Sequence, residues 1–492
     1  MLEYIIVIVY SLAIVFMFLY ALAELSLLIN YLSAKKKVKA LPKLNLDALK
    51  NGYPMVTIQL PVYNELYVME ALLENIAKID YPKDKLEIQV LDDSTDESYN
   101  LTKEHVEKLQ HTGLDIKHIH RVNRQGFKAG ALKEGLSIAK GEYIAIFDAD
   151  FLPNKDWLLQ TLPYFFNENI GLIQTRWGHT NQDYSWLTKI QAFALDVHFT
   201  LEQVGRNAGG HFMNFNGTAG IWRKECIIDA GNWEGDTLTE DLDLSYRAQL
   251  NDWKFIYLED VVAPAELPVA MSAAKSQQFR WNKGGAENFQ KMFKKLVSSK
   301  RVSFKTKVFG IFHLLNSSMF LNVFIVAVLS IPILYIKNEH TQLNGYFILM
   351  SFFIVTTLIY FIAFWFMYKI LYGKGFANFL RYIGIFLSFF SVAMGFSLHN
   401  TIAVLEGHLG RRSDFIRTPK FNLSAQNKNW KENKYVIQKM SPSVFFEGLL
   451  TLYFAFGMYS AFAVTDFGYF PFHLMLFIGF GFVFIKSLST KV

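Results

Sequence analysis

The sequence has 492 residues, of which 52% are hydrophobic and 46 are Phe, and its mean hydropathy is +0.18. This apolar content exceeds what one soluble core needs, so we expect a membrane protein. The net charge of +6 is small for the length and lies largely beside apolar runs, so no nucleic acid partner is implied. The single Cys226 excludes an internal disulfide and fits a reducing compartment.

The first apolar run, residues 5–29, is long enough to span a bilayer and carries one charge, Glu24. Three lysines at 35–37 follow it, which predicts that this end is cytoplasmic and the N-terminus lies outside. Residues 21–23 (Ala-Leu-Ala) mimic a signal cleavage site. However, the run is too long for a signal peptide and no basic residues precede it, so we predict a retained helix over 1–34.

Between Pro54 and Tyr257, short apolar runs alternate with polar, helix-like segments. This alternation predicts an α/β domain with a mostly parallel, doubly wound sheet, over residues 50–300. The predicted strands are 56–60, 86–91, 116–120 and 143–147, and the predicted helices are 71–78, 97–110 and 129–139.

The C-terminal half contains five apolar runs, which are 308–335, 346–371, 382–396, 444–464 and 469–485. Basic residues stand at both ends of the third run, so that run should not cross the membrane. We predict a helix over 376–408 in the cytoplasmic interface and five spans in the whole chain. The expected division is two spans over 304–371, an interface helix and a loop over 376–440, and two spans over 442–488.

A buried strand is predicted to end at Phe147, and Asp148 and Asp150 follow it directly. Open α/β sheets bind their ligands at the carboxyl ends of strands. Two carboxylates so close together repel each other unless a cation compensates, so the pair suggests a divalent metal that holds a phosphate. An acidic turn after a strand is the simpler alternative.

Four further signals join this pair. Asp93 ends another strand, and Lys128 begins a helix, where its ammonium can meet a phosphate. Thr239-Glu240-Asp241 precedes a helix, so one of its side chains is alternatively an N-cap. Gln277-x-x-Arg280-Trp281 lies within a helix. Each also has a structural explanation: a turn residue for Asp93, a solvated charge for Lys128, an ion pair for Arg280 and an interface anchor for Trp281.

In this order and spacing, the motifs resemble the signature of processive family 2 glycosyltransferases of the cellulose synthase-like and glucomannan (mannan) synthase group. The resemblance implies a GT-A (Rossmann-like) cytoplasmic domain followed by transmembrane and interface helices. The segment Phe415–Lys420 resembles the gating loop of these enzymes, although the family pattern has Val where this chain has Arg417.

The resemblance also implies roles for individual residues. Asp241 would be the general base, with Arg280 and Trp281 completing the catalytic set. Mg²⁺ or Mn²⁺ would be bound by Asp148 and Asp150. The nucleotide would contact Tyr63, Glu65, Asp93, Lys128, Asp148, Thr418 and Lys420. The acceptor would contact Trp177, Asn216, Gly217, Thr218, Gln277 and Trp281. His179, His198 and His211 lack metal-ligand spacing and are interpreted as ordinary polar residues.

The predicted function is inverting polymerisation of a nucleotide-activated hexose into a β-linked, β-1,4 polysaccharide that passes across the membrane. GDP-mannose, GDP-glucose and UDP-glucose stay open as donors, although Asn207–His211 resembles plant mannan and glucomannan synthases. The predicted partners are this donor, the growing polysaccharide and the lipid bilayer, and the predicted location is the plasma (inner) membrane. The alternatives are transfer of one sugar to a lipid such as ceramide or diacylglycerol, and a transporter with a nucleotide-binding domain. A transporter would place charges such as Glu24, Lys369, Glu447 and Asp466 inside its spans.

Overall fold

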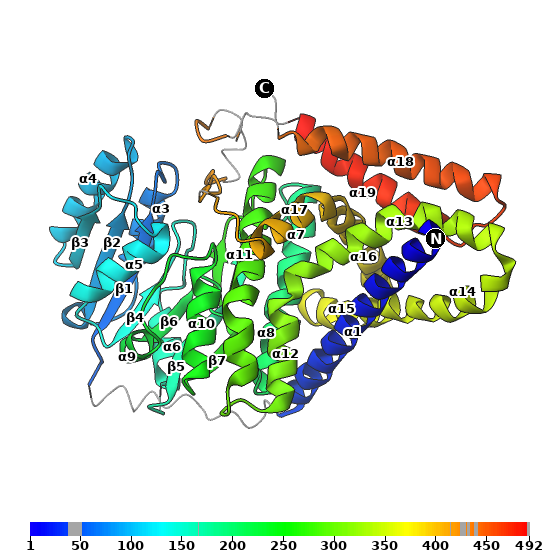
Figure 1. Ribbon diagram of the computed structural model, residues 1–492. Helices are drawn as coiled ribbons and strands as arrows, with labels where there is room; N and C mark the ends of the chain where they lie inside the picture. The colour runs from blue at the N-terminus through cyan, green and yellow to red at the C-terminus, as the bar shows by residue number, and fades with distance from the viewer. Residues whose placement is uncertain are drawn as a thin grey trace.

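The computed structural model of the protein describes residues 1–37, 52–165, 167–413, 415–423, 430, 433–436 and 441–489. An α/β domain occupies one side of the molecule and a group of long apolar helices the other (Figure 1). Helix α11 (Met271–Ser298) lies between them, since it packs against α10 of the α/β domain and against α17 (Ser397–His408) of the C-terminal half. Helix α11 therefore contacts both the α/β domain and the C-terminal helices.

The α/β domain contains one seven-stranded sheet with the order β3-β2-β1-β4-β6-β5-β7. All neighbouring strands are parallel except that β6 runs antiparallel to both β4 and β5, which confirms the predicted mostly parallel sheet. The strands are β1 (Val56–Val62), β2 (Leu86–Asp92), β3 (Asp115–His120), β4 (Tyr143–Ile146), β5 (Ile170–His179), β6 (Gly220–Arg223) and β7 (Lys254–Ala265).

Helices cover both faces of this sheet. Alternate apolar side chains of the strands point to opposite faces, so each strand contributes to two cores. One face packs against α3 (Met69–Ile76), α4 (Ser98–Gln110) and α6 (Trp157–Thr161). The other packs against α5 (Phe127–Ile138), α9 (Lys224–Asp229) and α10 (Glu240–Leu250).

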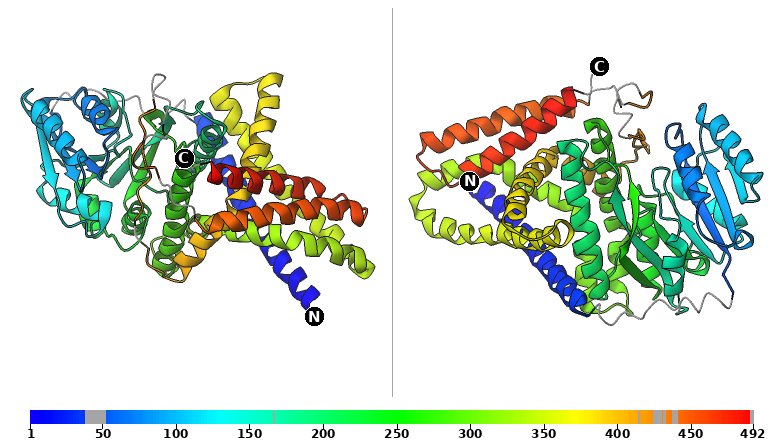
Figure 2. Two further views of the ribbon diagram at one scale, coloured as in Figure 1. Left: turned by 90° about the horizontal axis from the view of Figure 1, so that it is seen from above. Right: turned by 180° about the vertical axis from the view of Figure 1, so that it is seen from behind.

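Within the described part of the chain, six helical segments are long and apolar enough to cross a membrane. They are α1 (Leu2–Lys37), the segment Asn316–Glu339 with α13 (Met319–Glu339), the segment Thr341–Tyr372 with α14 (Asn344–Ser351) and α15 (Val355–Tyr372), α16 (Phe376–Gly395), α18 (Ser443–Ala463) and α19 (Phe470–Leu488). Helices α18 and α19 lie side by side along α13 (Figure 2, left).

Two sequence-based boundaries in this half were wrong. The expected single interface helix over 376–408 is two helices, α16 and α17, and α16 is long and apolar enough to span. Its position at the interface stays a prediction. The expected span over 308–335 begins later, because α12 (Phe304–Leu314) is a separate helix and the polar residues Asn316–Ser318 form a 3-10 turn before α13.

Candidate active site

A cavity opens at the carboxyl ends of β1, β2 and β4, which lie side by side in the sheet. Residues after these strands line it together with the start of α10, the middle of α11 and the segment 415–420. Of the predicted site residues, all except Thr218 line this cavity. Tertiary folding therefore brings together motifs that are hundreds of residues apart in the chain.

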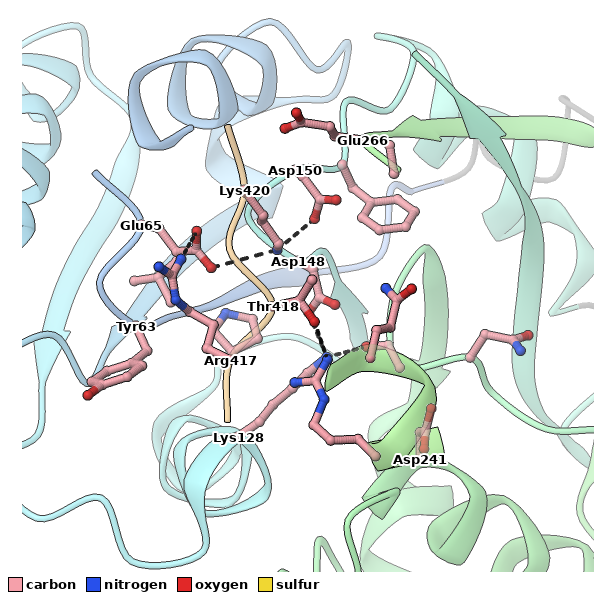
Figure 3. Close-up of a pocket in the computed structure, with 18 of the residues that line it drawn as sticks. Tyr63, Glu65, Lys128, Asp148, Asp150, Asp241, Glu266, Arg417, Thr418 and Lys420 are labelled. Carbon is pink, nitrogen blue, oxygen red and sulfur yellow. Dashed lines mark hydrogen bonds and ion pairs between the residues drawn. The ribbon is translucent and has the colours of Figure 1, made fainter. Parts of the chain in front are cut away.

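Asp148 lies directly after β4 and is held from two sides. Its Oδ1 atom is 2.6 Å from Nζ of Lys128, which also donates to the carbonyl oxygen of Gly217 at 2.8 Å. The backbone N–H of Asp148 donates to the hydroxyl of Thr218 at 2.9 Å. Burial opposes ionisation of Asp148, but the charges of Lys128 and Lys420 outweigh it and lower the pKa of this carboxyl. Asp148 is thus kept as a carboxylate facing the cavity (Figure 3).

The segment 415–420 closes over the second carboxylate. Nζ of Lys420 is 2.6 Å from Oδ1 of Asp150 and 3.8 Å from Oε1 of Glu65, which follows β1. Arg417 donates to the other oxygen of Glu65 at 2.7 Å. Arg417, at the position that departs from the family pattern, therefore ties the segment to the rim of the sheet (Figure 3).

Asp148 and Asp150 have the chemistry of a Mg²⁺ or Mn²⁺ site. Each uses its Oδ1 atom for a lysine, and within the described residues no hydrogen bond reaches either Oδ2 atom. Two carboxylate oxygens with phosphate and water as remaining ligands are a common set for Mg²⁺. Asp148 and Asp150 therefore fit a divalent cation whose other ligands would include oxygens of a diphosphate.

Two arginines that the sequence analysis did not single out contact the predicted nucleotide residues, and one of them, Arg124, also lines the cavity. Arg121 binds both carboxylate oxygens of Asp93, at 2.7 Å from Nε and 2.6 Å from Nη2. The guanidinium of Arg124 stacks 3.3 Å from the centre of the Tyr63 ring. Both arginines follow β3, an edge of the sheet that carries no motif, so only proximity in space reveals them.

Asp241 lies in the first turn of α10, and the N-cap residue of that helix is Thr239, whose side chain makes no capping hydrogen bond. Asp241 is not the N-cap residue, but its Oδ1 atom accepts the backbone N–H of Leu242 in this first turn at 2.8 Å. Burial and the neighbouring Glu240 raise the pKa of Asp241 to about 7. A carboxylate with a pKa near neutrality is suited to accept a proton from a hydroxyl group.

Helix α11 presents Gln277, Arg280 and Trp281 to the cavity. Nη2 of Arg280 donates to the hydroxyl of Thr418 at 2.8 Å, and its guanidinium lies 4.6 Å from the centre of the Phe415 ring. Burial lowers the pKa of Arg280 to about 10, so the side chain stays charged at neutral pH. This helix and the segment 415–420 thus meet above the carboxylates.

The predicted acceptor residues other than Thr218 line the same cavity. Gly217 has a φ of +79°, and a Cβ atom there would lie 3.1 Å from Oδ2 of Asp241, so its lack of a side chain leaves room beside that carboxylate. Trp177 packs edge to face on Phe151. The prediction that Thr218 contacts the acceptor does not match its placement, because it is fully buried and its hydroxyl holds Asp148 instead.

Glu266 is a third residue that the sequence analysis missed. It follows β7 and lines the cavity, and its carboxylate accepts the backbone N–H groups of Phe421 at 3.0 Å and Asn422 at 2.9 Å. Glu266 therefore fixes the backbone just after the segment 415–420, and it does so without the Lys420 side chain.

Lys420→Ala is expected to lower turnover by about 10- to 100-fold, because a hydrogen bond to a charged group contributes about 1.5–3 kcal/mol. The tie through Glu266 should keep the fold intact. Initial rates and the melting temperature measure the two effects. Lys434→Ala is the matched control, since Lys434 pairs with Asp96 and Glu97 and does not line the cavity. Unchanged turnover in Lys420→Ala would reduce the segment to a linker.

Comparison with known proteins shows which proteins this chain is similar to. Residues 54–284 match the family described as "Glycosyltransferase like family 2". Probable glucomannan 4-beta-mannosyltransferase 7 of Oryza sativa subsp. japonica is 44% identical over 268 residues, which cover 54% of this chain and 46% of that protein. Glucomannan 4-beta-mannosyltransferase 2 of Arabidopsis thaliana is 42% identical over 267 residues, covering 53% and 50%. The chain spans about half the length of the curated relatives it matches.

Among solved structures, the mannosyltransferase PcManGT from Pyrobaculum calidifontis, in complex with GDP-Man and Mn²⁺, has a TM-score of 0.50 and 21% sequence identity. The match covers 80% of this chain and 99% of that one. Together with the order of the strands in the sheet, this likeness shows the predicted GT-A fold.

Proposed function

We propose that this protein transfers a hexose from a nucleotide sugar to a growing β-1,4-linked polysaccharide. The observation that carries the proposal is the position of Asp241, a carboxylate with a raised pKa that faces the same cavity as Asp148 and Asp150. The likeness to plant glucomannan 4-beta-mannosyltransferases favours a GDP-activated mannose as the donor.

The donor would lie along the carboxyl edge of β1, β2 and β4. Tyr63, Asp93 and Arg124 would contact the nucleoside, and Arg121 would hold Asp93 in place. Lys128, Arg280 and Lys420 place positive charge where the diphosphate would lie. A divalent cation bound by Asp148 and Asp150 would add positive charge to the leaving diphosphate.

Transfer would be a single displacement. Asp241 accepts the proton of the acceptor hydroxyl as that oxygen bonds to the anomeric carbon, and the bond from this carbon to the diphosphate oxygen breaks. The nucleoside diphosphate leaves with the bonding electron pair. Because the hydroxyl enters opposite the leaving group, the configuration at the anomeric carbon inverts. Trp281 and Trp177 would offer flat ring faces to the acceptor sugars.

The raised pKa of Asp241 predicts how activity depends on pH. Only the ionised carboxylate accepts a proton, so kcat/KM should fall as the pH drops through about 7. With an unperturbed Asp, this decrease in kcat/KM would occur at a pH of about 3.9. The measurement is kcat/KM between pH 5 and 9 at constant ionic strength. A kcat/KM that shows no acid limb between pH 5 and 9 would contradict Asp241 as a base with a raised pKa.

The decisive test of the function is incubation of the purified protein, in lipid, with a panel of radiolabelled GDP-mannose, GDP-glucose and UDP-glucose, followed by sizing of the product. A long polymer supports the proposal. A single sugar attached to ceramide or diacylglycerol would support the lipid-modifying alternative, and no incorporation at all would overturn both.

We also propose that the α/β domain, over about residues 50–300, faces the cytoplasm of the plasma (inner) membrane. The support is the lysine cluster at 35–37 and the basic residues around Arg412. Cysteines introduced near Asp150 and Arg412 should resist an impermeant reagent in intact cells. The native Cys226 is buried and adds little background.

A further inference from the structure

One continuous helical segment, Trp186–Ala208, borders the cavity. It consists of α7 (Trp186–Asp196), the π-helical η4 (Val197–Glu202) and α8 (Gln203–Ala208). π-Helical segments inside α-helices are rare and occur frequently at functional sites. Here the π segment contains His198 and Glu202, two titratable residues that the proposed reaction does not use.

A backbone carbonyl group fixes the direction of the hydrogen bonds around this segment. Nε2 of Gln203 lies 3.0 Å from the carbonyl oxygen of Asn214, which only accepts, so this side of the Gln203 amide must be its NH₂ group. The same nitrogen lies 2.6 Å from the side chain of Asn216. The atom of Asn216 that faces it must therefore be the acceptor, Oδ1.

The orientation of Asn216 then determines the tautomer of His198. With Oδ1 turned to Gln203, Nδ2 of Asn216 faces Nε2 of His198 at 2.9 Å and donates to it. Nε2 of His198 is consequently unprotonated, and Nδ1 carries the proton and donates to Oε2 of Glu202 at 3.1 Å. Gln203, His198 and Glu202 on this helical segment thus hold the side-chain amide of Asn216 in one orientation.

Buried charges keep Glu202 in place. Arg206, which is 3% exposed, lies 3.7 Å from Oε2 of Glu202 and interacts with Glu24 of α1. Gly205 allows α1 to approach closely, because a Cβ atom there would lie 2.6 Å from the carbonyl oxygen of Leu27. Helix α1 therefore packs against the helical segment that carries His198 and Glu202.

Asn216 connects this network to the reacting groups. It lines the cavity and immediately precedes Gly217, the residue that leaves room beside Asp241. His198 uses one hydrogen of its NH₂ group, and no other described residue accepts the second, which can donate to a ligand. A saccharide hydroxyl oxygen is the kind of acceptor that would meet it in this cavity.

We propose that His198 and Glu202 are positioning residues for the acceptor: they orient Asn216 so that its second amide hydrogen binds a hydroxyl oxygen of the acceptor saccharide beside Asp241. The inference rests on the proposed function, since it assumes a saccharide acceptor. It assigns a purpose to a histidine that sequence analysis treated as an ordinary polar residue.

The test uses two nearly isosteric replacements of His198. In His198→Gln the side-chain oxygen can accept the N–H of Asn216, whereas His198→Met has a similar shape and no comparable acceptor. With GDP-mannose as donor and β-1,4-linked mannohexaose as acceptor, His198→Met should raise the acceptor KM by about three- to tenfold, the effect of one hydrogen bond. His198→Gln should stay near wild type, and the donor KM and melting temperature should not change in either variant.

A double-mutant cycle separates positioning from a general structural effect. If His198 acts through Asn216, then His198→Met should have no further effect on the acceptor KM in an Asn216→Ala background. An equal increase in both backgrounds, or no increase in either, would overturn the inference while leaving the proposed function intact. Absence of both sugar transfer and mannohexaose binding in the wild type, measured by calorimetry, would overturn the two together.

Discussion

Replacing Asp241 with Asn is expected to abolish measurable sugar transfer while donor binding persists. The amide keeps the shape of the carboxylate but cannot accept the proton of the acceptor hydroxyl. General-base assistance contributes about 100- to 10,000-fold to rate. The side-chain oxygen of Asn can still accept the backbone N–H of Leu242, which Asp241 accepts at 2.8 Å, so a loss of activity would not be explained by loss of this bond. Initial rates with the radiolabelled donor, and calorimetric titration with GDP, measure the two effects.

The neighbouring carboxylate provides the control for this experiment. Glu240 is also buried in the first turn of α10 and lines the same cavity, and burial raises its pKa. Glu240→Gln should retain substantially more activity than Asp241→Asn if Asp241 is the base. The opposite order of the two variants, or transfer by Asp241→Asn at a rate near wild type, would move the role to Glu240.

Replacing Asp150 with Asn is expected to weaken Mn²⁺ binding in the presence of GDP by at least about 10-fold. Even residues that only support a metal ligand typically contribute 10- to 100-fold to affinity, and Asp150 is proposed as a direct ligand. Transfer should weaken in parallel and recover partly at high Mn²⁺ concentration. Electron paramagnetic resonance of free Mn²⁺ measures the affinity. This response separates Asp150 from Asp241, whose replacement should leave Mn²⁺ affinity unchanged.

Lys420 complicates this test, because Asp150→Asn also removes the carboxylate that lies 2.6 Å from its ammonium group. The Lys420→Ala background removes that complication: there, Asp150→Asn should still weaken Mn²⁺ binding. Asp183→Asn serves as the surface control, since the Asp183 side chain is 80% exposed. Equal Mn²⁺ affinities with Asp and Asn at position 150 would exclude Asp150 from the metal site.

The structure also bears on the transporter alternative. Of the charges expected near or inside spans, Glu447 accepts hydrogen bonds from Lys275 of α11 at 2.6 and 2.8 Å, and Asp466 accepts one from Lys337 at 2.5 Å. Glu24 interacts with Arg206. Each of these carboxylates thus has a cationic partner, and the pair between α11 and α18 joins the helix of Arg280 to the membrane helices. Structural pairing explains these charges without an ion pathway.

The sequence by itself was sufficient for the features that depend on near neighbours. The strand at Tyr143–Ile146 and the helix at Phe127–Ile138 follow from local apolar patterns, and the motifs at their ends follow from spacing. Apolar length alone also indicated most of the membrane helices. It misplaced the start of α13, because three polar residues in a long apolar run scarcely change its average hydropathy.

Only the tertiary structure decided which groups meet. Arg417 and Glu65 are 352 residues apart in the chain, and no local pattern in either segment indicates the other. The same holds for Arg121 beside Asp93 and for His198 beside Asn216. Hydropathy and turn chemistry are properties of a short segment, whereas hydrogen bonds and ion pairs require two groups within about 3 Å in space. That distance is set by how the strands are ordered in the sheet and how the helices pack on it.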